Sequence, residues 1–268
     1  MNKKKRFYLI ILLLFLSVAV CCLTQLLPKR RLDDKEIQKL RLEYPIMYKG
    51  EVNPLMSVDT SKSGIRKIVE GADTFVYCEI IGEPVYRKIF IGTGIAELDK
   101  EVFENTEYNA VQYHFPIRII SDTEGIFEKG QEITYCYGVT NQDYDPNRAI
   151  GEKIVIPIYI SGGESKGEFY TSIKGYYYIT TEGYAISAFS ENNIRYNGLK
   201  VDVLMESLAK TESEREAYLE LKKQEYEWFR GEDGFVKIED FKSKVKNELV
   251  PKNQELVKSL KENSLAEK

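Results

Sequence analysis

Near the start of the chain, apolar residues run from Phe7 to Leu27 without a charged interruption. As an α-helix these 21 residues would be roughly 31 Å long, close to the thickness of a bilayer's hydrocarbon core, about 30 Å. Basic residues flank both ends of the run, and the short N-terminal tail favours a cytoplasmic N-terminus. The pattern predicts a cytoplasmic tail at 1–6, a single-pass anchor in the cell membrane at 7–27, and an extracytoplasmic remainder.

Two alternatives treat the same apolar run as an export signal that is removed. Residues 17–19 offer small side chains for a signal peptidase, and Cys21 or Cys22 could carry the lipid of a lipoprotein. The residues before these cysteines depart from the Gly, Ala or Ser that acylation prefers, so a retained anchor is our preferred interpretation. All three alternatives export the rest of the chain.

Two short helical patterns follow the anchor. Residues 33–43 place Ile37 and Leu40 on one side, which is typical of a juxtamembrane stalk, here assigned to 28–56. The stretch 57–72 holds an amphipathic helix at the start of the next domain, with Gly as its stop. Its apolar face consists of Ile65, Ile68 and Val69.

From residue 73 onward the pattern changes to short runs rich in Val, Ile, Tyr, Phe and Thr, separated by Gly, Pro, Asp and Asn. In the third run, apolar Phe115 and Ile117 alternate with His114 and Arg118, so one face belongs to a core. These runs predict a small antiparallel β-barrel or sandwich of five to seven strands within a domain at 57–200. The runs are 74–81, 85–95, 111–120, 131–139, 153–160, 175–181 and 185–189.

The pattern returns to helix over 201–268. Thr211 and Glu214 have the spacing of a capping box that opens one helix, and a second helix follows, with Pro251 as its end or a kink. We expect this helical pair to dock on the barrel; the alternative is an apolar stripe offered to a partner. The stripes are Ala217, Leu221 and Trp228, and then Ile238, Phe241, Val245 and Leu249.

Charge is distributed unevenly along the chain. The net charge is −4, but the first 31 residues hold seven basic residues and no acidic one, which leaves 31 basic and 42 acidic residues for the rest. A domain with a net charge of −11 is unsuited to nucleic acid, which proteins bind largely through Lys and Arg contacts to phosphate. Nucleic-acid binding is therefore excluded from the functions we consider.

The chain has a single histidine, His114, which excludes zinc sites built from two or three histidines. It alternates with core-facing residues, so we interpret it as a surface side chain. A catalytic base paired with Cys78, Cys136 or a serine is the alternative, but no nucleophile motif accompanies it. The sequence predicts neither a catalytic group nor a cofactor or metal.

Cys78 and Cys136 are the cysteines outside the apolar run, and both fall within predicted strands. Two cysteines in an exported domain could form a disulfide. However, Cys78 shares the core-facing side of its strand, whereas Cys136 alternates with core-facing neighbours. Two buried free thiols are therefore the preferred interpretation.

Tyrosine is abundant, with 19 residues. Its ring and hydroxyl suit protein or glycan recognition at low entropic cost, although tyrosine is also an ordinary strand former. The residues that could form a binding surface are Tyr135, Tyr137, Tyr176 and Tyr178.

Residues 64–189 carry an order of features found in a known class of proteins. GIRKIVEGADTFVYCEIIGE is followed by YHFPIRIISDTEGIFEKG, GEKIVIPIYI and YYYITTEGYAIS. This order resembles exported or membrane-anchored, uncharacterised Gram-positive bacterial proteins with an OB-like, netrin-like β-barrel. The resemblance implies the barrel and export, and no catalytic residue. The N-terminal cysteine with which related inhibitor modules bind a protease's metal has no counterpart here.

Together these patterns predict a membrane-anchored, non-catalytic binding or assembly domain for a protein or envelope partner. One alternative is an envelope hydrolase that uses acidic residues, since carboxylates such as Glu79 and Glu83 are plentiful. Another is a lipoprotein with a structural role.

Overall fold

The computed structural model describes residues 31–46, 60–89, 110–139, 149–160, 167–172, 175–189, 196–225 and 237–266. The predicted tail at 1–6 and anchor at 7–27 lie outside these ranges. Among the described residues, no helix is both long enough and apolar enough to cross a membrane.

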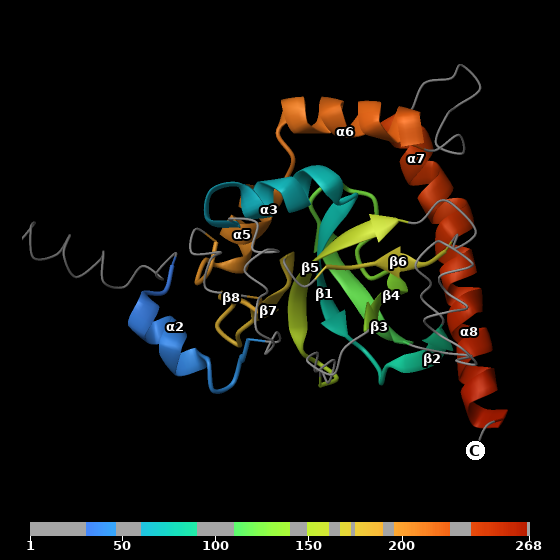
Figure 1. The fold of residues 1–268 in the computed structure, drawn as a ribbon, viewed down its shortest axis with the longest axis horizontal. Coiled ribbons are helices and arrows are strands. Elements are labelled where there is room, and N and C mark those ends of the chain that lie inside the picture. The colour runs from blue at the N-terminus through green and yellow to red at the C-terminus, as the bar shows by residue number, and fades with distance from the viewer. Residues whose placement is uncertain are drawn as a thin grey trace, which may run out of the picture.

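Five strands close into a β-barrel, which confirms the predicted mainly-β barrel with helical additions (Figure 1). They follow the order β1-β3-β4-β6-β5, and β5 returns to pair with β1. Every pair is antiparallel except β4 with β6, which is parallel. The strands are β1 (Thr74–Ile80), β3 (Ala110–Asp122), β4 (Glu132–Val139), β5 (Lys153–Ile160) and β6 (Phe169–Tyr170).

Three further strands extend this barrel. β2 (Val85–Ile89) follows β1 after residues 81–84, which are not in a strand. It pairs with the part of β3 that does not pair with β1. β7 (Tyr177–Ile179) pairs with β5, and β8 (Ala185–Ser187) pairs with β7. The sequence missed β6, because a strand of two residues is too short to show a period.

The barrel interior is filled as the alternation on β3 predicted. Phe115, Ile117 and Ile119 are buried there, whereas their neighbours point outward. β5 differs, because it is buried on both faces: Ile154 lies in the interior and Val155 in a second apolar cluster outside the barrel. Helices α3 (Thr60–Gly71) and α5 (Val201–Leu208) complete this outer cluster with Ile65, Val69, Leu204 and Leu208.

Helix α6 (Glu212–Glu225) begins with the predicted capping box. Thr211 Oγ1 accepts from the backbone N of Glu214 at 3.3 Å, and the Glu214 carboxylate accepts from the backbone N of Thr211 at 2.8 Å. The predicted apolar stripe is wrong at Ala217 and Leu221, since both are exposed, Leu221 to 41%, and Tyr218 and Lys222 are buried instead. Trp228, its third member, lies outside the described residues. The helix docks through polar contacts, which an apolar period does not reveal.

The C-terminal helix docks on the barrel, as expected. It runs from α7 (Ile238–Lys244) through a π-helical turn (Val245–Leu249) into α8 (Val250–Ala266), along the side of the barrel opposite α2 (Figure 1). Phe241, Val245 and Leu249 are buried in the main core. Pro251 does not end the helix. Proline lacks an N–H and clashes with the preceding turn, and the wider π turn lies directly before it.

The expected stalk is wrong for residues 31–46, which pack against the barrel. Helix α2 (Asp34–Leu40) is capped by Asp33 and buries Ile37. The Leu32 backbone N donates to Gly198 O at 2.8 Å, and Arg41 Nη1 donates to Ser187 O at 2.6 Å. These long-range contacts make the segment part of the folded domain.

Gly198 allows this close packing. Its φ is +78°, and an added Cβ would lie 2.9 Å from Ile37 Cδ1 and 3.2 Å from Leu32 O.

We expect Gly198→Ala to lower the free energy of unfolding by about 2–3 kcal/mol, since it combines a strained φ with overpacking. Gly130→Ala is the control, because its φ of +83° is similar and no atom lies within 4 Å of its Cβ. Urea denaturation measures both; equal losses would contradict a steric role for Gly198.

Candidate functional site

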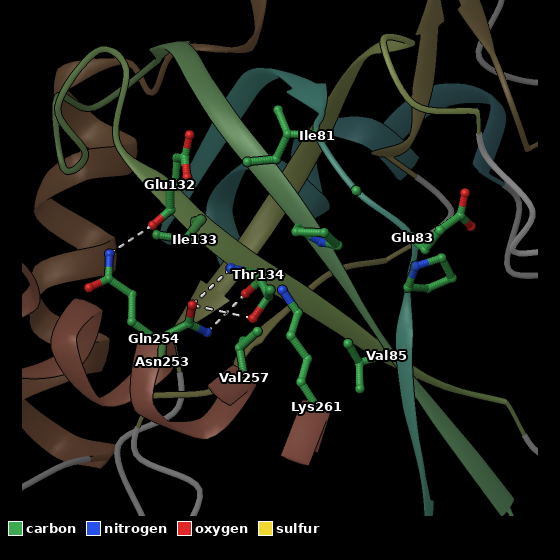
Figure 2. Close-up of a pocket in the computed structure, with 13 residues that line it drawn as sticks. Ile81, Glu83, Val85, Glu132, Ile133, Thr134, Asn253, Gln254, Val257 and Lys261 are labelled. Atoms are coloured by element: carbon green, nitrogen blue, oxygen red, sulfur yellow. Dashed lines mark hydrogen bonds between the residues drawn. The ribbon is translucent and has the colours of Figure 1, made fainter. Parts of the chain in front are cut away.

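A cleft of about 670 Å³ lies between α8 and the outer face of β2, β3 and β4 (Figure 2). The break between β1 and β2 forms one wall, Pro116 and Thr134 form the floor, and α8 forms the other wall. This volume falls within the range of small-ligand sites. The lining residues are Ile81, Gly82, Glu83, Pro84, Val85, Pro116, Glu132, Ile133, Thr134, Asn253, Gln254, Val257 and Lys261.

Asn253 holds α8 at the edge of this cleft. Its side chain is 1% exposed. Oδ1 accepts from the Thr134 backbone N at 2.8 Å, and Nδ2 donates to the Thr134 carbonyl oxygen at 3.0 Å (Figure 2). Nδ2 also donates to the carbonyl oxygen of Gly167 at 2.8 Å. The amide thus pairs with both backbone groups of Thr134, as a neighbouring strand would.

Gly167 lets the helix come this close. Its φ is +92°, and an added Cβ would lie 2.8 Å from Lys252 Cβ and 3.0 Å from the Asn253 backbone N. A sequence signal for Asn253 did exist, because it follows Leu249 by four residues and so interrupts the apolar stripe with an amide. A buried amide on such a stripe needs polar partners.

The cleft combines apolar walls with opposite charges. Val85 is buried, and Val257 is half-buried on the facing helix. Figure 2 shows Lys261 extending from α8 into the cleft, with Glu83 on the opposite wall. The carboxylate of Glu132 is ion-paired with Arg118 at 3.0 Å. The described lining residues include no Ser, Cys or His.

His114 is buried, and its interpretation as a surface residue is wrong. It is 1% exposed, on the same outer face of β3 as Pro116 but in a polar cluster beyond the cleft. Its Nε2 lies 3.3 Å from Gln112 Oε1, which accepts from Arg87 Nε at 2.6 Å. Arg87 also forms an ion pair with Glu168. Strand alternation identified the face correctly, but it does not tell whether that face is covered.

The polar cluster favours the neutral forms of His114 and Cys136. Burial, and then the charge of Arg87, lowers the pKa of His114 to about 4, against a raising effect of Glu168. Burial raises the pKa of the Cys136 thiol well above its usual range. A neutral histidine beside a protonated thiol is not an activated nucleophile, although register pairs His114 with Cys136.

Three of the four tyrosines predicted to form a binding surface lie in the interior. Tyr135, Tyr176 and Tyr178 are at most 3% exposed. Tyr135 stacks on Phe115 at 5.4 Å between ring centroids, and the Tyr178 hydroxyl donates to Pro45 O at 2.7 Å. These three rings therefore stabilise the core, while the side chain of Tyr137 lies outside the described part.

Cys78 and Cys136 are both free and buried. Cys78 belongs to the barrel interior, whereas Cys136 faces outward, with its Sγ 3.5 Å from Gln112 Nε2. The barrel wall thus separates the two thiols, and the disulfide considered from sequence is not formed.

Three deeply buried carboxylates each have a cationic partner. Asp73 is paired with Lys222 at 3.1 Å, Glu124 with Arg215 at 3.2 Å, and Glu168 with Arg87. Asp73 also accepts from the Tyr218 hydroxyl and the Ile160 backbone N. These acids join helices or strands to the barrel, and none of the three lines the cleft.

No protein-family model, curated protein or solved structure matches the chain.

Asn253→Ala should lower the free energy of unfolding by about 3 kcal/mol, because the Thr134 and Gly167 backbone groups lose buried partners. The matched control is Asn247→Ala, an exposed asparagine in the same helix. Asn247 lies in the π-helical turn just before α8, so both substitutions replace Asn by Ala within one continuous helical segment. Chemical denaturation gives both values, and a loss below about 1 kcal/mol for Asn253→Ala would refute its role in holding α8.

The neutral state of His114 predicts a dependence of stability on pH. Its folded pKa of about 4 lies below its ordinary value, so the unfolded state binds more protons between about pH 4 and pH 6.5. The free energy of unfolding that His114 contributes is therefore fully present above pH 6.5. It is lost, on the order of 3 kcal/mol, as the pH drops towards 4. The unfolding free energies at pH 7 and pH 4 should differ less in His114→Gln than in the unsubstituted protein. The same pH dependence in both proteins would contradict the pKa shift.

Proposed function

We propose that this protein is a membrane-anchored, extracytoplasmic binding domain that holds a short segment of an envelope protein in the cleft beside α8. We also infer that the barrel is OB-like. Numbered within the barrel alone, its strands follow the order 1-2-3-5-4 and close on the first, with the third and fifth parallel. The membrane anchor itself is supported by the uncharged run from Phe7 to Leu27.

The cleft is the observation that carries the binding function. It is large enough for a few residues of extended peptide, and its walls supply apolar contact through Val85, Pro116 and Val257. Glu83 and Lys261 on opposite walls would orient a segment that carries both charges. The hydrolase alternative has less support, because Glu132 in the cleft is paired with Arg118 and a glycosidase needs two available carboxyl groups.

Filling the cleft tests this function. A photoreactive amino acid in place of Glu83, introduced into the full-length protein in cells, should crosslink to a discrete partner. Val257→Trp fills the cleft and should lower the adduct yield at least about tenfold. Lys258→Trp, at an exposed position next to it on α8, should leave the yield unchanged.

The result depends on the difference between the two tryptophan variants, both of which must keep the thermal unfolding midpoint of the parent. Equal adduct yields in Val257→Trp and Lys258→Trp, or no discrete adduct from position 83, would rule out the cleft as the binding site.

A further inference from the structure

We propose that the α2 end of the domain lies directly on the phospholipid surface of the membrane that holds the anchor, with Leu42 among the headgroups. This orientation rests on the proposed anchor at 7–27. It assigns a lipid contact to a face that the sequence predicted to be a free stalk.

The tether between anchor and barrel is short. The chain is fixed to the barrel from Arg31, which forms a β-bridge with Leu199, and the Leu32 backbone N donates to Gly198 O at 2.8 Å. Four residue steps separate Leu27 from Arg31, and fully extended they span at most about 14 Å. The headgroup layer takes up roughly 5–8 Å of that distance. The Arg31–Leu199 bridge is therefore held at the membrane surface.

Helix α2 lies next to this attachment point and cannot swing away from the barrel. Ile37 is buried in the core, and the guanidinium of Arg41 donates to Ser187 O at 2.6 Å. Directly after α2, the side chain of Leu42 is 96% exposed, the largest value among the large hydrophobic residues that the structure describes as exposed. A single exposed leucine is common on protein surfaces. Here a short tether brings it to a lipid surface that can cover it.

The shape of the molecule agrees with this orientation. α2 and α8 lie at opposite ends of the longest axis of the domain (Figure 1). With the α2 end on the membrane, α8 and the cleft beside it lie at the end of the domain far from the bilayer (Figure 1). Another envelope protein could then reach the cleft without displacing lipid.

Charge attraction is not what holds this face to the membrane. Basic and acidic residues on and around α2 balance one another, so the contact depends on the tether and on the apolar side chain. We therefore expect it to persist at salt concentrations that screen surface charges. The balanced residues are Arg31, Lys35, Lys39 and Arg41, and Asp33, Asp34, Glu36 and Glu43.

Fluorescence quenching by lipid tests the orientation. The full-length protein, with Cys21 and Cys22 replaced by alanine, is reconstituted in phosphatidylcholine vesicles and labelled with bimane at Leu42→Cys. The matched control is Leu221→Cys, an exposed leucine on α6, away from α2 (Figure 1). Cys78 and Cys136 are buried and should not react. Brominated lipid should quench the label at 42 at least about twofold, with or without high salt, and leave the label at 221 unchanged.

Two results would overturn the proposal in different ways. Equal quenching of the two labels, in protein that stays in the vesicle fraction at its full intact mass, would reject the orientation and leave the anchor standing. In the unsubstituted protein from cells, an intact mass that starts at Cys21 or Cys22 with added lipid, or a cleaved soluble species, would reject the helical anchor and this orientation together.

Discussion

The position of the C-terminal helix depends on the side chain of Asn253. Phe241, Val245 and Leu249 pack this helix on the core through apolar contacts, which have no preferred direction. Here an amide on α8 pairs with both backbone groups of Thr134 on β4 and also reaches the carbonyl of Gly167, just before β6. β4 and β6 are the two strands that meet in parallel, a pairing slightly less stable per residue than an antiparallel one, and two residue pairs join them. The same side chain therefore braces the barrel and sets the width of the cleft.

The two sides of the barrel wall are covered in different ways. Around β1 and β5 the outer face is apolar and is covered by α3 and α5, so β5 is buried on both sides. Around β3 and β4 the outer face is polar, and buried hydrogen bonds join it to Arg87, Glu168 and Asn253. A covered polar face tolerates few changes, because each buried donor or acceptor needs its partner. This explains why a histidine and a thiol can lie there without serving catalysis.

Sequence patterns predicted most of the fold, but little of the candidate site. Alternation on β3 identified the residues inside the barrel, and the stripe through Phe241 and Leu249 identified the docked side of the C-terminal helix. The same patterns failed for side chains on outer strand faces, because other segments of the chain cover these faces and bury them. His114 and Tyr178 were expected at the surface, yet β2, β6 and residues 31–46 cover or contact them. On helix α6 the buried side is polar instead of apolar. Tyr218 and Lys222 bind Asp73 there, so no apolar stripe marks the side of the helix that docks.

The sequence by itself determined the local properties of the chain: strand and helix periods, the capping box at Thr211, the strong charge asymmetry and the predicted anchor. These depend on neighbours within a few residues, whose geometry each secondary structure sets. Only the tertiary structure decided which polar face is buried, that residues 31–46 belong to the domain, and that a cleft lies beside α8. Those features arise between residues such as Thr134 and Asn253, 119 positions apart, whose meeting depends on how the barrel closes.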